Sequence, residues 1–204
     1  MMNWIVALFL QLLLMAVPVS AMQIEADPRT IISFMDKSLS PELDILRVTT
    51  DITPDNHLVF QVKTKAERIS GEDSDYLLLS IQHEKTYALL IPLNKAEGEN
   101  IRVYEGVLQP GSKLTSIKFK ESGISRSHAG FVARHIVRGA EFIVPLDWIN
   151  FGADFGFDAF TVQAEIQEST LQISKVYDQA RKGRAEEKRI SAITLLNNIC
   201  SPKK

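Results

Sequence analysis

The densest group of side chains able to recognise a ligand lies between residues 148 and 160. It contains five aromatic residues and two aspartates: Trp148, Phe151, Phe155, Phe157, Phe160, Asp154 and Asp158. Aromatic faces stack on the apolar faces of sugar rings, and carboxylates accept hydrogen bonds from sugar hydroxyls. The segment therefore predicts a carbohydrate-binding site built from Trp148, Phe151, Asp154, Phe155 and Asp158. The same composition is also typical of residues that close one end of a β-sandwich, and this interpretation stays open.

A second candidate site is basic. The stretch from residue 122 to residue 140 has no acidic residue but contains Arg126, His128, Arg134, His135 and Arg138. Clustered positive charge attracts anions, so we expect Arg126, His128 and Arg134 to bind an anionic ligand such as a sulfated or uronic sugar. A solvated loop or strand edge would have the same composition.

A third candidate is an acidic loop at residues 70–75, which carries Glu72, Asp73 and Asp75. Hard oxygen ligands on a short flexible turn are what Ca²⁺ binds in proteins. The loop is therefore a candidate calcium site, and Ca²⁺ is the one cofactor that the sequence indicates. The ligand spacing of an EF-hand is absent, so an ordinary surface turn is the alternative.

The histidines do not fall into a catalytic motif. His83 and Glu84 are adjacent, but the second histidine of the zinc-protease motif is missing. Residues 125–128 lack the glycines of the hydrolase nucleophile elbow. The sequence therefore predicts no catalytic residue and favours a non-enzymatic protein. A hydrolase of unrecognised type, using His128 or His135 with nearby carboxylates, is the alternative.

These candidates must be positioned by strands, because apolar and polar residues alternate with a period of two along residues 44–168. Seven to nine short segments alternate, separated by turn signals such as Pro54-Asp55-Asn56. Segments 77–81 and 87–93 are apolar on both faces, which predicts central strands, whereas residues 131–138 fit a helix about as well as a strand. No long helical pattern intervenes, so we expect an antiparallel β-sandwich, jelly-roll or immunoglobulin-like.

Residues 1–21 have the pattern of a signal peptide. A run of 14 residues, Trp4–Val17, is apolar except for Gln11 and is followed by Pro18 and by small residues that a signal peptidase accepts. We expect cleavage before Met22 and a periplasmic or secreted bacterial protein. An uncleaved membrane anchor is the alternative, although the run is shorter than the ~18–20 apolar residues of a spanning helix. Cys200 is the only cysteine, so no disulfide can form within the chain.

The C-terminal residues 179–204 differ in composition from the predicted sandwich domain of residues 22–178. From residue 175 onward there are eight basic and three acidic residues, although the whole chain has a formal charge of -2. Apolar residues recur at helical spacing over residues 185–199, at Ile190, Ile193, Leu196 and Ile199. This pattern predicts an amphipathic helix that either packs on the sandwich or docks a partner or an anionic membrane surface. The near-neutral total charge argues against a nucleic-acid partner.

Two parts of the sequence have a recognisable order of segments. The first is the hairpin Asp44–Val48, Thr53–Asp55 and Leu58–Val62, and the second is Glu141–Ile149, with its Pro145-Leu146, before Phe160–Ala164. This order resembles the DOMON and family-nine carbohydrate-binding superfamily of β-sandwiches. The resemblance implies a sandwich fold and a sugar, haem or quinone-linked redox cofactor as ligand, with structural calcium in some members. Sugar-binding members hold the ligand between two tryptophans, whereas Trp148 is the only tryptophan expected after cleavage.

Together these features predict an exported, non-enzymatic binding or interaction protein whose partner is a glycan or another protein. A nucleic-acid partner is not expected. The alternatives are the secreted hydrolase described above and a secreted effector that acts on a host or competitor.

Overall fold

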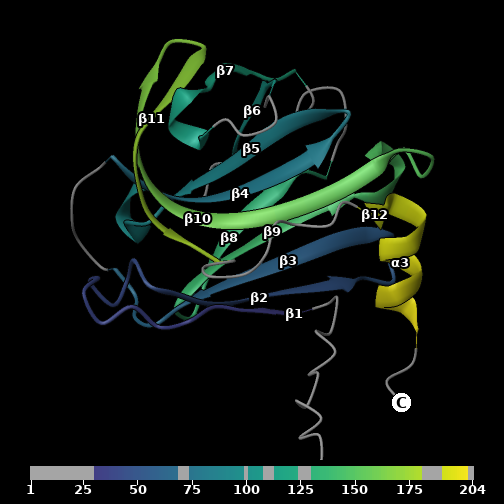
Figure 1. Cartoon of the computed structure of the whole chain (residues 1–204), viewed down its shortest axis with the longest axis horizontal. Coiled ribbons are helices and arrows are strands. Elements are labelled where there is room, and N and C mark those ends of the chain that lie inside the picture. Colours follow the sequence, from purple (N-terminus) through teal and green to yellow (C-terminus); the bar gives the residue numbers. More distant parts are fainter. Residues whose placement is uncertain are drawn as a thin grey trace, which may run out of the picture.

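The computed structural model describes residues 30–68, 74–98, 101–107, 113–123, 130–180 and 190–201. In these residues two antiparallel β-sheets pack against each other, and a short helix lies at one end of the molecule (Figure 1). The structure therefore confirms the predicted antiparallel β-sandwich with a C-terminal helix. The expected signal peptide of residues 1–21 lies outside the described residues. No helix in the described part of the chain is long and apolar enough to cross a bilayer.

The first sheet has five strands and contains the hairpin that the sequence predicted. Its order is β1 (Thr30–Ile32), β2 (Ile45–Ile52), β3 (His57–Thr64), β9 (Gly139–Pro145) and β8 (Val132–Ile136). In the turn between β2 and β3, Asn56 has a φ of 58°, a left-handed conformation that asparagine tolerates. The Thr53 N–H donates to the His57 carbonyl at 2.9 Å and closes this turn.

Residues 131–138, which fit both a helix and a strand by periodicity, form strand β8. This strand pairs with β9 from Val132 opposite Ile143 to Ile136 opposite Gly139. Gly139 has a φ of 143°, and a Cβ atom there would lie 1.9 Å from the carbonyl oxygen of Val62 on β3. Only glycine fits so close an approach in this conformation. Pairing with β9 therefore decides the conformation of a segment whose own pattern is ambiguous.

The second sheet has seven strands, and six of them close into a ring. The order is β11 (Thr170–Gln179), β7 (Lys118–Glu121), β6 (Arg102–Gly106), β5 (Lys85–Pro92), β4 (Asp75–His83), β10 (Asp154–Gln167) and β12 (Ile190–Ser191). The ring closes because β11 also pairs with β10. One edge of β10 pairs with β4 over Gly156–Gln163, while the other pairs with β11 over Phe160–Gln167. Figure 1 shows β10 and β11 curving upward to reach β7.

The closed ring has a core of its own, distinct from the core between the two sheets. On β4, Leu77, Leu79 and Ile81 pack in the core between the sheets. Tyr76 and Leu78, which alternate with them, belong to the second core together with residues of β5, β6, β7, β10 and β11. Strand β5 divides its residues in the same way. The central position predicted for segments 77–81 and 87–93 is confirmed, and their two apolar faces serve two cores.

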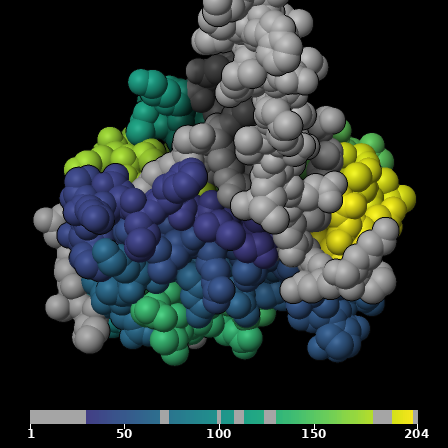
Figure 2. Space-filling view, turned by 60° about the horizontal axis from the view of Figure 1, so that its bottom comes forward, coloured from purple at the N-terminus to yellow at the C-terminus, as the bar shows by residue number. Residues whose placement is uncertain are grey.

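The C-terminal helix α3 (Ala192–Cys200) packs on one end of the sandwich. Its N-cap is Ser191, whose side chain accepts a hydrogen bond from the Thr194 N–H at 3.3 Å. The buried face consists of Ala192, Leu195 and Ile199, whereas Ile193 is 53% exposed. The predicted stripe is therefore confirmed in part: Ile199 is buried and Leu196 packs against the core, whereas Ile193 is exposed and Ile190 belongs to β12, because the helix begins only at Ala192. Figure 2 shows α3 (yellow) at one end of the face formed by the N-terminal strands (purple and blue).

Candidate functional site

An aromatic cluster occupies one end of the sandwich, and two of the predicted sugar-binding residues belong to it. Trp148 ends the 3-10 turn η3 (Leu146–Trp148), which directly follows β9. Its ring centroid lies 5.5 Å from His83, 5.0 Å from Tyr87 and 5.3 Å from Phe131, each at a steep interplanar angle. Phe155 joins the cluster through His83, at 5.7 Å. Three neighbouring rings therefore hold the half-buried Trp148 side chain in place.

The other residues of the predicted sugar site are placed differently. Phe151 is 45% exposed and lies in the turn between η3 and β10. Side chains alternate along a strand, so Asp154 and Asp158 point to the face of β10 opposite Phe155. Asp154 is exposed, whereas Asp158 is buried and accepts hydrogen bonds from Gln179 Nε2 at 2.7 Å and the Ala159 N–H at 2.8 Å. The structure thus brings Trp148 and Phe155 together and separates them from the two carboxylates.

His83 connects strand β4 to the loop before β10 at this end of the molecule. No sequence motif indicated it as a binding residue. It ends β4 and is only 4% exposed. Its Nδ1 lies 3.1 Å from the Asp154 carbonyl oxygen, and its Nε2 accepts a hydrogen bond from the Asn150 N–H at 2.9 Å. Nε2 accepts a hydrogen bond only when it is unprotonated, so this pattern corresponds to a neutral ring that donates from Nδ1. Asn150 also donates from Nδ2 to Glu84 Oε1 at 2.7 Å, so loop and hairpin form one unit.

Two adjacent pockets flank the β4–β5 turn, and we call them together the hairpin groove. The larger, of about 550 Å³, is lined by Lys85, Glu105, Gly106, Val107, Ser116, Ile117, Lys118 and Lys120. The smaller, of about 290 Å³, is lined by Gln82, His83, Glu84, Lys85, Thr86, Val107, Ala153 and Asp154. Lys85 and Val107 line both pockets, so the two spaces share one wall.

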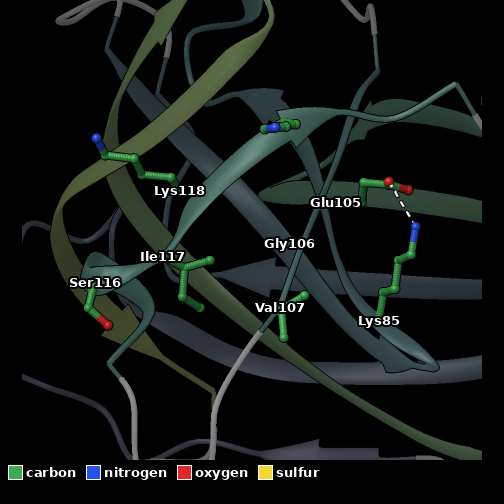
Figure 3. Close-up of a pocket in the computed structure, with 8 residues that line it drawn as sticks. Lys85, Glu105, Gly106, Val107, Ser116, Ile117 and Lys118 are labelled. Atoms are coloured by element: carbon green, nitrogen blue, oxygen red, sulfur yellow. Dashed lines mark hydrogen bonds and ion pairs between the residues drawn. The ribbon is translucent and has the colours of Figure 1, made fainter.

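The larger pocket brings together residues from three strands and a turn. Lys85 begins β5, Glu105 and Gly106 end β6, and Lys118 begins β7. Ser116 ends η2 (Leu114–Ser116), just before β7. Figure 3 shows Lys85 and Glu105 on one side of the pocket and Ser116 and Lys118 on the other, with Val107 and Ile117 between them. Antiparallel pairing of β5, β6 and β7 therefore gathers these side chains at one end of the ring.

The two halves of the hairpin groove have opposite charge. The larger pocket has three lysines and one glutamate in its lining, whereas the smaller has Glu84 and Asp154 against Lys85. Lys85 Nζ donates to Glu105 Oε1 at 3.0 Å, and this hydrogen bond raises the pKa of Lys85 above its usual value. Lys118 and Lys120 are exposed, and no ion pair within the described ranges includes either of them. The positive end of the groove is therefore the end near β7.

The basic candidate site is described only in part, because Arg126 and His128 lie outside the described residues. Arg134 lies on the outer face of β8, where its Nε donates to Glu141 Oε1 at 2.7 Å. Glu141 is buried and also accepts from Gln61 Nε2 at 2.8 Å through its other oxygen. These contacts form a ladder across β8, β9 and β3, in which the Arg134 charge already has a partner.

The acidic candidate loop is also described only in part, since Glu72 and Asp73 lie outside the described residues. Asp75 begins β4, is 3% exposed, and uses both carboxylate oxygens within the protein. Arg68 donates to Oδ2, and the Tyr177 hydroxyl donates to Oδ1 at 3.0 Å. In the part of the chain that the structure describes, no three His, Cys, Asp or Glu side chains are grouped as a metal site would require.

Of the two histidines named for the alternative hydrolase, only one lies within the described residues. His128 lies outside the described residues, and His135 is a partly buried residue of β8. The hydrogen bonds of His83 go to the backbone atoms of Asp154 and Asn150 rather than to a nucleophile.

Comparison of the chain with protein-family models, with curated proteins and with solved structures finds no match. The assignment of a function below is therefore argued from the groove and its lining residues.

Proposed function

We propose that this chain is an exported, non-enzymatic binding protein that holds a carbohydrate in the hairpin groove. The observation that carries the proposal is that the two pockets share a wall. Lys85 and Val107 line both of them, and the pockets have volumes of about 550 and 290 Å³. Binding sites for small molecules typically have volumes of ~300–1,000 Å³. A short oligosaccharide could therefore lie across the shared wall with one end in each pocket.

The lining of the groove suits a ligand with hydroxyl groups. Lysine, glutamine, threonine and serine side chains supply hydrogen-bond donors, and Glu84, Asp154 and Glu105 supply acceptors. Val107 is 76% exposed and offers an apolar surface between the two pockets. Sugars present both hydroxyl groups and apolar ring faces, so a mixed lining of this kind fits them. Phe151 is also exposed, two residues before Ala153 of the smaller pocket, and supplies a ring on which a sugar could stack.

The proposal is also supported by the rigidity of the groove. His83 lines the smaller pocket and is hydrogen-bonded on both ring nitrogens, so it joins the β4–β5 turn to the loop before β10. A site that is already ordered loses less conformational entropy when a ligand binds. We assign the aromatic cluster this supporting role, with Trp148 beneath the groove. Export to the periplasm or beyond follows from the signal-peptide pattern of residues 1–21 and belongs to the same proposal.

The test is a glycan array followed by calorimetry on the purified full chain. We expect at least one glycan to bind and to be recovered intact, as judged by mass spectrometry. Val107→Ala removes apolar contact area from the shared wall, so the Kd should rise about fivefold. Val137→Ala is the matched control, since Val137 is 70% exposed in the turn between β8 and β9, at the other end of β9 from η3. An array without binding, a cleaved glycan, or equal effects of the two variants would contradict the proposal.

A further inference from the structure

We infer that the larger pocket of the hairpin groove recognises an anionic group of the carbohydrate, a carboxylate or a sulfate ester. This inference rests on the proposed function and names the substrate class for the same groove. Its basis is the charge of the lining, in which Lys85, Lys118 and Lys120 face a single acid, Glu105. Ammonium groups form their strongest hydrogen bonds with ionised acceptors.

The free positive charge in this pocket belongs to β7. Lys85 Nζ already donates a hydrogen bond to Glu105 Oε1 at 3.0 Å, and the Ser122 hydroxyl donates to Glu105 Oε2 at 3.2 Å. Lys118 and Lys120 alternate with the buried Phe119, so both side chains project from the same outer face of the strand. Two ammonium groups from one strand face, at the border of a concave pocket, can contact one anionic group together.

The smaller pocket restricts what the rest of the ligand can be. Glu84 and the exposed Asp154 place negative charge at that end of the groove. A polyanion lying along the whole groove would meet these carboxylates and be repelled. The ligand that fits both ends is therefore an acidic sugar at the β7 end joined to a neutral or amine-bearing sugar at the other. Uronic and sulfated sugars share the anionic group, and the experiment separates them.

The experiment measures binding of three probes by calorimetry at low salt. They are a disaccharide of one galacturonic acid joined to galactose, the methyl ester of this disaccharide, and a galactose disaccharide with a single sulfate ester. The test variant is Lys118→Gln with Lys120→Gln. Its control is Lys37→Gln with Lys65→Gln, which removes the same charge from exposed lysines that do not line the groove. Asp154→Asn is a third variant, and it should act in the opposite direction.

We expect the unmodified chain to bind one of the two acidic probes more tightly than the ester. The β7 variant should weaken that binding about tenfold, whereas the control variant should change it less than about twofold. Asp154→Asn should tighten that binding about twofold. Added salt should reduce the preference for the acidic probe, the loss in the β7 variant and the gain in Asp154→Asn. Equal affinity for acid and ester, or equal losses in the β7 and control variants, would overturn the inference and leave the proposed function standing. A chain that binds no sugar on the array would instead overturn the proposed function itself.

Discussion

His83 Nε2 and the Asn150 N–H are joined by a hydrogen bond of 2.9 Å that connects the end of β4 to the loop before β10. The same ring contacts the Asp154 carbonyl oxygen through Nδ1, at 3.1 Å. Because His83 is 4% exposed, water cannot readily replace either partner. One imidazole thus holds both ends of a five-residue loop, Asn150–Asp154, that borders the smaller pocket.

The first prediction concerns His83→Phe. Phenylalanine keeps a ring in the aromatic cluster but leaves the Asn150 N–H and the Asp154 carbonyl without their partner. We expect the free energy of unfolding, measured by urea denaturation, to fall by about 2–4 kcal/mol. His57→Phe is the control, because His57 is only partly buried, and its effect should stay below about 1 kcal/mol. Equal losses in the two variants would show that the His83 hydrogen bonds contribute little.

The second prediction concerns the two carboxylates that contact Arg68. Asp75 is nearly buried beside the Arg68 guanidinium, whereas the Glu42 side chain is 24% exposed and lies 3.4 Å from it. Asp75→Asn leaves a largely buried guanidinium without its main counter-charge, so the free energy of unfolding should fall by about 3 kcal/mol. Glu42→Gln should cost less than about 1 kcal/mol. Urea denaturation of both variants measures the difference, and a larger loss in Glu42→Gln would contradict this assignment.

Much of the fold could be predicted from the sequence because strand alternation reports directly which face is buried. Segments 77–81 and 87–93 are apolar on both faces, and this correctly predicted central strands. It did not reveal the closed ring, because two apolar faces say nothing about what covers each of them. The ring depends on β10 pairing with β4 along one edge and with β11 along the other. Such pairing between distant segments leaves no periodic signal.

The site was less predictable for a related reason. Trp148 and Phe155 lie seven residues apart in the sequence, and their composition indicated an aromatic cluster. His83 belongs to the same cluster, and its ring nitrogens contact the backbone of Asn150 and Asp154. Every residue type has these backbone groups, so the sequence does not indicate such partners. Lys85 and Lys118 are 33 positions apart and meet in one pocket only because β5, β6 and β7 pair in order.

The third prediction concerns alkaline pH. Burial, and secondarily the Glu105 charge, raises the pKa of the Tyr87 phenol above its ordinary value of 10.0. The folded state therefore binds the phenolic proton more tightly than the unfolded state, so the stabilisation is complete below about pH 10. It is lost as the pH rises through the folded-state pKa. Urea denaturation from about pH 8 to about pH 11 should show a shallower loss of stability in Tyr87→Phe than in the unmodified chain. Parallel curves would contradict the prediction.

The fourth prediction concerns Gly139, the first residue of β9. A Cβ atom at this position would lie 1.9 Å from the Val62 carbonyl oxygen, in a backbone conformation with a φ of 143°. Gly139→Ala must therefore displace β9 from β3, and we expect a loss of about 3 kcal/mol or more in the free energy of unfolding. At Gly123 nothing lies within 4 Å of the added atom, so Gly123→Ala should be close to neutral. Similar stabilities of the two variants, measured by urea denaturation, would argue against this close approach.

The fifth prediction separates a structural role of α3 from a docking role. Leu195 is 4% exposed in the core between the sheets, so Leu195→Ala should lower the free energy of unfolding by about 2–4 kcal/mol. Ile193 is 53% exposed on the same helix, so Ile193→Ala should cost less than about 0.5 kcal/mol. If the helix docks a partner or a membrane surface, Ile193 is the apolar side chain available for that contact. Ile193→Ala would then weaken vesicle or partner binding without changing stability, whereas equal destabilisation by both variants would contradict the packing seen at this end of the sandwich.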